Sequence, residues 1–346
     1  MNHKERALAA VKHELPDRVP AFVSAIEYPD RLVEHFGLKD VEELYEFLGY
    51  DFRTVFPQYT GADPHKNVYN HFGLPAKGTY SSKQVPLPFA KSETIKEIDS
   101  FPWPSVDEWD FESLHAELDK IHDKYAVIAG AWAPIFCQVL WFFGLEEAMI
   151  NMHVNPGLIE AALAHIEEFF MVYYRRFFAA VSGKAVFFNM GDDFATQRGM
   201  MIDPAHWRRF FKPVYRKIFE LAKSHGLYVW FHACGAITDV LPDLIDIGLD
   251  VWETVQAHLP GNEPERIKRD FGKNLTFYGA INTQDTLPNG TPDDVRKEVR
   301  ERIKILGAGG GYICGPDHQL KVEVPFENIT ALFDEINRFR HAGCTL

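Results

Sequence analysis

The residues best suited to chemistry are one histidine and two cysteines, each at the end of an apolar run. His232 and Cys234 end the stretch "LYVWFHAC", and Cys314 ends "GGYIC". Side chains two apart on a strand point to the same side, so His232 and Cys234 can face one ligand. One imidazole and two thiolates suit tetrahedral Zn²⁺, and three protein ligands leave open the fourth position that a catalytic metal needs. Ordinary core packing of free cysteines is the competing interpretation, and the spacing alone does not decide between them.

The elements that would position these residues are short apolar strands alternating with amphipathic helices, as expected for parallel strands that are covered on both faces. Eight such β-then-α units are typical of a single (β/α)8 TIM barrel, in which the chemistry lies at the carboxyl ends of the strands. A doubly wound open sheet is the rival architecture. The expected strands are 19–24, 51–57, 125–132, 185–191, 227–233, 250–255, 275–281 and 310–315.

Three segments carry clear helix signals: 156–183, 203–226 and 291–307 each have a Pro near the start and a Gly at the end. Pro213 should kink or divide the second of them. We expect one domain over residues 1–346, with an N-terminal helical extension. The Pro- and Gly-rich segment 58–104 interrupts the rhythm, and we expect an excursion after the second strand, with a hairpin and a lid over the barrel mouth.

Charge and composition exclude several classes of protein. The net charge of −13 argues against nucleic acid and anionic membranes as partners, because both require a basic face. No run approaches the roughly 18 apolar residues of a membrane span, and the N-terminal stretch is not of signal-peptide type. The four cysteines are scattered, which fits reduced thiols in the cytoplasm.

Long blocks of the chain resemble one known family. The blocks "ERALAAVKHELPDRVPAF", "GDDFATQRGMMIDPAHWRRFFKP", "HACGAITDVLPDLIDIGLDVWETVQ" and "GAINTQDTLPNGTPDDVRKEVRERIKILGAGGGYICGPDHQLKVEVPFENI" together look like the uroporphyrinogen decarboxylase superfamily. This resemblance spans nearly the whole chain and implies a (β/α)8 barrel.

Two branches of that superfamily are relevant. The true decarboxylases open with a Pro-x-Trp-Met-Arg-Gln-Ala-Gly-Arg segment, and this chain has "VPAFVSAIEYPDR" in that place. The other branch, the corrinoid-linked methyltransferases, uses a His-x-Cys and a distant Cys as zinc ligands, which His232, Cys234 and Cys314 match. The resemblance therefore implies Zn²⁺, a small-molecule methyl donor or acceptor (a methoxylated compound, an alcohol, an amine or a thiol), and cobalamin supplied by a corrinoid protein that docks at the barrel mouth. A homodimer is compatible with the sequence, which does not determine the assembly.

Other polar and aromatic residues at the expected strand ends are candidates for the same site. A carboxylate with a raised pKa could protonate a leaving group, and one near the zinc could orient a ligand or serve as a resting ligand. Helix capping, an ion pair with Arg198, or core packing are the competing interpretations. The candidates are Asp192, Asp193 and Glu253 for catalysis, and Gln256, Asn282, Trp132, Tyr59 and His318 for substrate binding.

Three functions remain open at this point. The leading hypothesis is a zinc-dependent methyltransferase that moves a methyl group between a small molecule and a corrinoid protein. The second is a cofactor-free decarboxylase of the uroporphyrinogen decarboxylase type, whose activity would persist after complete removal of metal. The third is a degenerate barrel that only binds a tetrapyrrole or a corrinoid protein.

Overall fold

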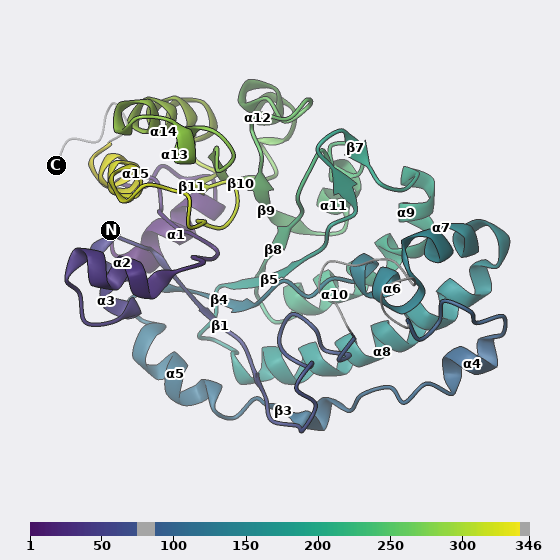
Figure 1. Ribbon diagram of the computed structural model, residues 1–346. Coiled ribbons are helices and arrows are strands. Elements are labelled where there is room, and N and C mark those ends of the chain that lie inside the picture. The colour runs from purple at the N-terminus through teal and green to yellow at the C-terminus, as the bar shows by residue number, and fades with distance from the viewer. Residues whose placement is uncertain (75–86, 340–346) are drawn as a thin grey trace.

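The computed structural model describes residues 1–74 and 87–339, and at its centre lies a curled parallel sheet (Figure 1). Seven strands lie in the sheet in their order along the chain, each paired in parallel with the next. They are β1 (Phe52–Val55), β4 (Ala126–Gly130), β5 (Phe187–Gly191), β8 (Tyr228–His232), β9 (Leu249–Val255), β10 (Thr276–Ile281) and β11 (Tyr312–Pro316).

The segment around Ala21 fills the gap between the first and last strands. The Cys314 amide donates to the Pro20 carbonyl at 2.8 Å, and on the other side the Asp51 amide donates to the Ala21 carbonyl at 3.0 Å. Ala21 forms only an isolated parallel bridge with Cys314. The predicted strand 19–24 is therefore reduced to one bridge, since Pro20 has no N–H to contribute to a ladder. The TIM-barrel architecture itself is confirmed.

Helices surround the curled sheet (Figure 1). The predicted helices at 156–183 and 291–307 are confirmed as α8 and α14, and the helix at 203–226 is divided into α9 and α10 directly before Pro213. The helices are α1 (His3–Val11), α2 (Pro29–Phe36), α3 (Val41–Phe47), α4 (Ile95–Asp99), α5 (Leu114–Ile121), α6 (Phe136–Phe143), α7 (Leu145–Val154), α8 (Pro156–Ala180), α9 (Pro204–Phe210), α10 (Lys212–Ser224), α11 (Leu241–Asp246), α12 (Pro264–Phe271), α13 (Thr286–Asn289), α14 (Pro292–Leu306) and α15 (Phe326–Arg338), with a 3-10 turn at Val106–Glu108.

The excursion after β1 is held together at its two ends. Strand β2 (Gln58–Tyr59) pairs antiparallel with β3 (Trp109–Asp110), so the two ends of the excursion lie side by side. Part of the expected hairpin and lid falls on residues 75–86, outside the described residues. A second short ribbon, β6 (Ala195–Thr196) with β7 (Gly199–Met200), follows β5.

An aromatic layer fills the barrel beneath the carboxyl ends of the strands. The Trp230 ring lies at the centre of this layer, with ring centroids 5.5 Å from Phe52, 5.5 Å from Phe187 and 5.2 Å from Tyr278. All four side chains are buried. These rings identify which strand positions point inward, which decides what reaches the site above them. In the part of the chain described, no helix has both the length and the apolar character needed to cross a bilayer.

Candidate metal centre

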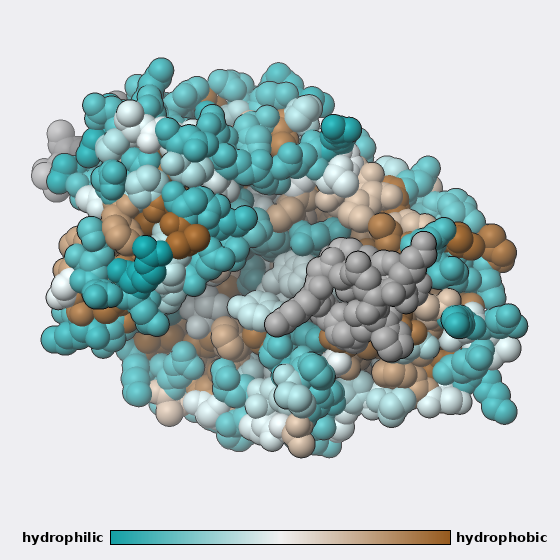
Figure 2. Space-filling model, viewed as in Figure 1, coloured by the Kyte–Doolittle hydropathy of each residue, from teal (hydrophilic) through white to brown (hydrophobic). Residues whose placement is uncertain are grey.

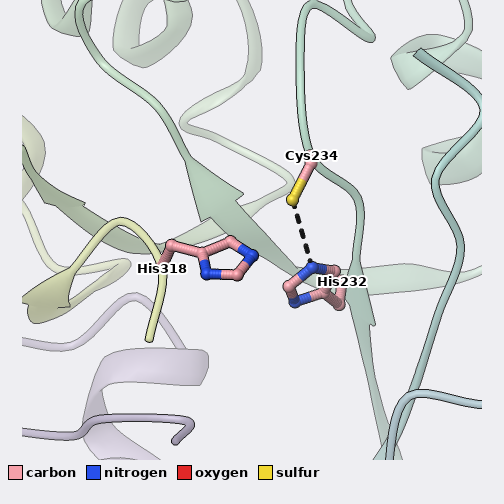
Figure 3. Close-up of side chains that lie close together, drawn as sticks. All are labelled: His232, Cys234 and His318. Atoms are coloured by element: carbon pink, nitrogen blue, oxygen red, sulfur yellow. Dashed lines mark hydrogen bonds between the residues drawn. The ribbon is translucent and has the colours of Figure 1, made fainter. Parts of the chain in front are cut away.

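His232 and Cys234 lie together directly above the aromatic layer. Trp230 points into the barrel from β8, so His232, two residues later, points the same way one step nearer the mouth. The Cys234 Sγ is 3.3 Å from the His232 Nε2 (Figure 3). The prediction that these two side chains face one point is confirmed.

His318 completes a group of three potential ligands (Figure 3). It follows β11 in the loop after Pro316, and its ring lies 5.7 Å from that of His232 in an edge-on arrangement. One ligand atom from each of His232, Cys234 and His318 lies within 4.8 Å of the other two. Within the described ranges this is the only such group of three, and all three residues are partly buried.

Cys314 is not part of this group, although the sequence analysis named it as a ligand. Ile313 pairs in register with Tyr278, which belongs to the aromatic layer, so Ile313 faces the barrel interior and Cys314 faces the surrounding helices. The Cys314 Sγ accepts a hydrogen bond from the Tyr312 hydroxyl at 3.4 Å. Burial raises the pKa of this thiol to about 12. The structure offers His318 where the sequence analysis had placed Cys314.

Glu253 holds the imidazole of His232 from behind. Its Oε1 is 3.0 Å from the His232 Nδ1, and its Oε2 accepts from the Trp230 Nε1 at 2.5 Å and from the Asn189 Nδ2 at 3.2 Å. A carboxylate on Nδ1 keeps the proton there and leaves Nε2 free to bind a metal, which is the usual arrangement behind a metal-binding histidine.

The charges of this network are coupled. Burial opposes ionisation of His232, but the neighbouring Cys234 and Glu253 raise the pKa of its imidazole well above the ordinary value. Burial raises the pKa of the Cys234 thiol, and the His232 charge outweighs that effect and brings the pKa down to about 7. Glu253 is also buried, and its hydrogen bond with His232 keeps the pKa of its carboxyl below the usual range. The network therefore favours a thiolate at Cys234.

Gly191 makes room for the site on the neighbouring strand. A Cβ at this position would lie 2.6 Å from the His232 Cβ and 2.6 Å from the Trp132 Cδ1, closer than carbon atoms can pack. Asn189 lies two residues earlier and contacts Glu253, so alternate positions of β5 face the site. Asp193 continues this alternation one step nearer the mouth.

A cavity of about 620 Å³ opens over the site. Figure 2 shows a hollow in the face in view, over the strands labelled β4, β5 and β8 in Figure 1. Most of its wall is aromatic or aliphatic, and its polar lining includes His232, Glu253, His318 and Asp193. The Asp193 Oδ1 and the Trp132 Nε1 are shielded from solvent and have no hydrogen-bond partner within the described residues.

Asp192, the other carboxylate of the pair, points away from the cavity. It is fully buried and accepts hydrogen bonds from the amides of Ile135 at 2.7 Å and Cys137 at 3.1 Å, from the Phe136 amide, and from the Tyr215 hydroxyl. Burial raises the pKa of this carboxyl to about 6, although these donors oppose the shift. Asp192 thus caps the start of α6, which is the capping interpretation and not the catalytic one.

Three further candidates hold turns and do not line the cavity. The Gln256 Oε1 accepts from the Gly235 amide at 2.8 Å and so supports the turn after Cys234. The Asn282 Oδ1 accepts from the Gln284 amide at 2.8 Å. The Tyr59 hydroxyl accepts from the Asp63 amide at 3.2 Å. Their predicted contact with substrate is not supported by these positions.

Two further residues of the site were not predicted from the sequence. Asn189 contacts Glu253, and the Thr254 Oγ1 lies 3.6 Å from the Cys234 Sγ. The sequence does hold a signal for Asn189. Phe187, Asn189 and Gly191 are two apart and therefore share the inner face of one strand, and Asn189 is the polar residue on that face.

Comparisons with known proteins are consistent with this architecture. A family model described as uroporphyrinogen decarboxylase (URO-D) matches residues 83–339, which is most of the chain. A methylated-thiol–coenzyme M methyltransferase of Methanosarcina mazei is 27% identical over 217 residues, which cover 62% of this chain and 54% of that relative. The match thus spans about half the length of the curated relative. A solved methyltransferase from Methanosarcina mazei superposes with a TM-score of 0.66 at 20% identity, covering 97% of this chain and 98% of the other.

Proposed function

The chain belongs to the uroporphyrinogen decarboxylase family, and within that family we propose that it is a zinc-dependent methyltransferase. The observation that carries the proposal is the convergence of His232, Cys234 and His318 on one point, with Glu253 fixing the imidazole of His232. A relative that methylates coenzyme M supports the same class of reaction.

The donor set fits Zn²⁺ in type and spacing. Zinc in proteins binds thiolate at about 2.3 Å and imidazole at about 2.0 Å, so two such ligands on a tetrahedral ion lie about 3.5 Å apart. The separation of 3.3 Å between Cys234 Sγ and His232 Nε2 is close to that value. Three protein ligands would leave a fourth position for a substrate, as catalytic zinc sites do.

The residues around the site have separable roles in this proposal. Zn²⁺ bound there would act as a Lewis acid, lowering the pKa of a substrate thiol or stabilising a departing heteroatom. Glu253 fixes the tautomer of His232, and Trp230 and Asn189 fix Glu253 in turn. The aromatic and aliphatic wall of the cavity excludes water from the reacting atoms.

We propose a sulfur compound as the substrate that meets the metal, since the relative acts on methylated thiols and on coenzyme M. In this proposal the methyl group is exchanged with cobalamin carried by a corrinoid protein that docks at the barrel mouth, where the cavity opens.

The alternative, decarboxylation of a polycarboxylate, is disfavoured by the cavity. A substrate with many carboxylates needs many paired cations, because each unpaired buried charge is costly. Arg53 is the only arginine among the described lining residues, which include no lysine, and its guanidinium is already paired with Glu42 at 2.7 Å.

The proposal is tested by an assay of methyl transfer from free methylcobalamin to a small thiol, in which the loss of methylcobalamin absorbance measures the reaction. We expect turnover that stops after removal of metal by a chelator and returns with Zn²⁺. Oxygen-free incubation with uroporphyrinogen is the parallel assay. Decarboxylation that persists in chelated protein, with no methyl transfer under any condition, would contradict the proposal.

A further inference from the structure

The charges around the cavity do not balance once their internal partners are counted. Arg53 is neutralised by Glu42 through its Nε and Nη2 groups, and its Nη1 donates to a backbone carbonyl. Glu253 is held by three donors that belong to the metal site. Among the described lining residues, Asp193 and Glu117 remain as carboxylates for which no ion pair is formed. The cavity is therefore acidic.

Of these two carboxylates, Asp193 follows the strand next to the metal ligands, just beyond the carboxyl end of β5. It lies two residues beyond Gly191, where an added Cβ would be 2.6 Å from the His232 Cβ, and Asp193 and His232 both line the cavity. One of its oxygens is shielded from solvent and unpartnered, and the Trp132 Nε1 in the same wall is also unpartnered. Buried polar atoms are almost always hydrogen-bonded in folded proteins, so the unpartnered Asp193 oxygen points to a ligand that donates a hydrogen bond there, whereas the Trp132 Nε1 is itself a donor and needs an acceptor such as water.

We propose that the cavity selects a thiol substrate whose other end is a cationic amine, paired with Asp193, and that it rejects thiols with an anionic end. This inference rests on the proposed function, because it places the thiol at the His232, Cys234 and His318 site. A cation would neutralise Asp193, whereas a sulfonate or carboxylate would meet like charge and find no free arginine or lysine among the described lining residues.

Three thiols of nearly equal length test the proposal. They are cysteamine, which is cationic, 2-mercaptoethanol, which is neutral, and 2-mercaptoethanesulfonate (coenzyme M), which is anionic. Isothermal titration of the zinc-loaded protein measures each Kd, and the metal-free protein serves as the reference. We expect cysteamine to bind at least about tenfold more tightly than the neutral thiol, since a hydrogen bond to a charged group commonly contributes that much. The anionic thiol should bind most weakly.

Two matched variants locate the selecting charge. Asp193→Asn is isosteric and should remove the cysteamine preference, whereas Glu117→Gln removes a carboxylate elsewhere in the wall and should keep it. Equal binding of the three thiols by the wild type, tightest binding of the anionic thiol, or an unchanged preference in Asp193→Asn would each overturn the inference while leaving the metal site intact. Failure of all three thiols to bind the zinc-loaded protein would overturn the proposed function and this inference together. The wild-type ranking decides the matter even if a variant fails to fold.

Discussion

Replacing Glu253 by Gln removes one charge and keeps the shape of the side chain, so it isolates the role of this carboxylate. Glu253 accepts from His232, Trp230 and Asn189, and an amide offers only one oxygen in place of two. If its NH₂ group faces His232, the imidazole must accept at Nδ1, and its proton moves to Nε2, where the metal would bind. If the NH₂ group faces Trp230, two N–H donors oppose each other in a buried site.

Each orientation of the new amide in Glu253→Gln predicts a different measurable loss. The wrong tautomer should lower zinc affinity by about 10- to 100-fold, which is the usual cost of disturbing the partner of a metal-binding histidine. An unpaired indole N–H should lower the free energy of unfolding by about 1–3 kcal/mol. We therefore expect Glu253→Gln to lose zinc affinity, stability, or part of both.

Competition with a chromophoric chelator measures the zinc affinity, and urea denaturation of the metal-free protein measures the stability. Glu298→Gln is the matched control, because Glu298 is a buried carboxylate on α14, where it pairs with Arg302. Wild-type zinc affinity in Glu253→Gln, with unchanged stability, would refute the reasoning that places Glu253 behind the metal ligand.

Three further outcomes follow from the same structure. Gly191→Ala should lower the free energy of unfolding by about 1–3 kcal/mol because the new Cβ overlaps His232 and Trp132. Gly157→Ala, whose Cβ meets nothing closer than 3.7 Å, is the control. Equal urea midpoints for Gly191→Ala and Gly157→Ala would contradict the packing argument. In metal-free protein, iodoacetamide should alkylate Cys234 with a midpoint near pH 7 and leave Cys314 unmodified, because their thiol pKa values are about 7 and about 12. Mass spectrometry identifies the modified cysteine. Faster alkylation of Cys314 than of Cys234 would contradict the placement of Cys234 in the site and of Cys314 in the core. Asp51→Asn should lower the free energy of unfolding by about 3–5 kcal/mol, since Arg6 and Arg18 both pair with this buried carboxylate at 2.6 and 2.7 Å. Although burial opposes ionisation, the hydrogen bond with His3 and the charges of Arg18 and Arg6 hold the pKa of Asp51 below its usual range, so its contribution to stability is present above the unfolded pKa and is lost as the pH falls through the folded one. A pH series of denaturation that is identical for the variant and the wild type would exclude this contribution.

The barrel could be predicted from the sequence because its strands are apolar runs punctuated by clear helix signals. Seven of the predicted strands recur as β1, β4, β5, β8, β9, β10 and β11. The segment at 19–24 could not be judged in the same way, since its role is to close the ring through hydrogen bonds with β11 and β1 that only the folded chain reveals.

Part of the candidate site could be predicted from the sequence, and the rest depends on strand register and on the path of a loop. His232 and Cys234 are two apart, so their common side follows from strand geometry alone. Whether Cys314 faces the barrel or the helices depends on the register of β11 with β10, and the pairing of Ile313 with Tyr278 turns Cys314 outward. His318 comes from a loop, whose path no periodicity describes. Asp192 and Asp193 were both candidates for catalysis, with helix capping as the competing interpretation, and the hydrogen bonds of Asp192 to the amides of Ile135 and Cys137 show that it caps α6.

The central claim is that His318, and not Cys314, is the third metal ligand, and elemental mass spectrometry tests it most directly. The protein is purified under reducing conditions without chelator, alongside Cys234→Ala, His318→Ala and Cys314→Ser. We predict close to one zinc per chain in the wild type and in Cys314→Ser, and loss of zinc in Cys234→Ala and His318→Ala. Full zinc in His318→Ala together with its loss in Cys314→Ser would contradict the account, as would a folded wild type without metal.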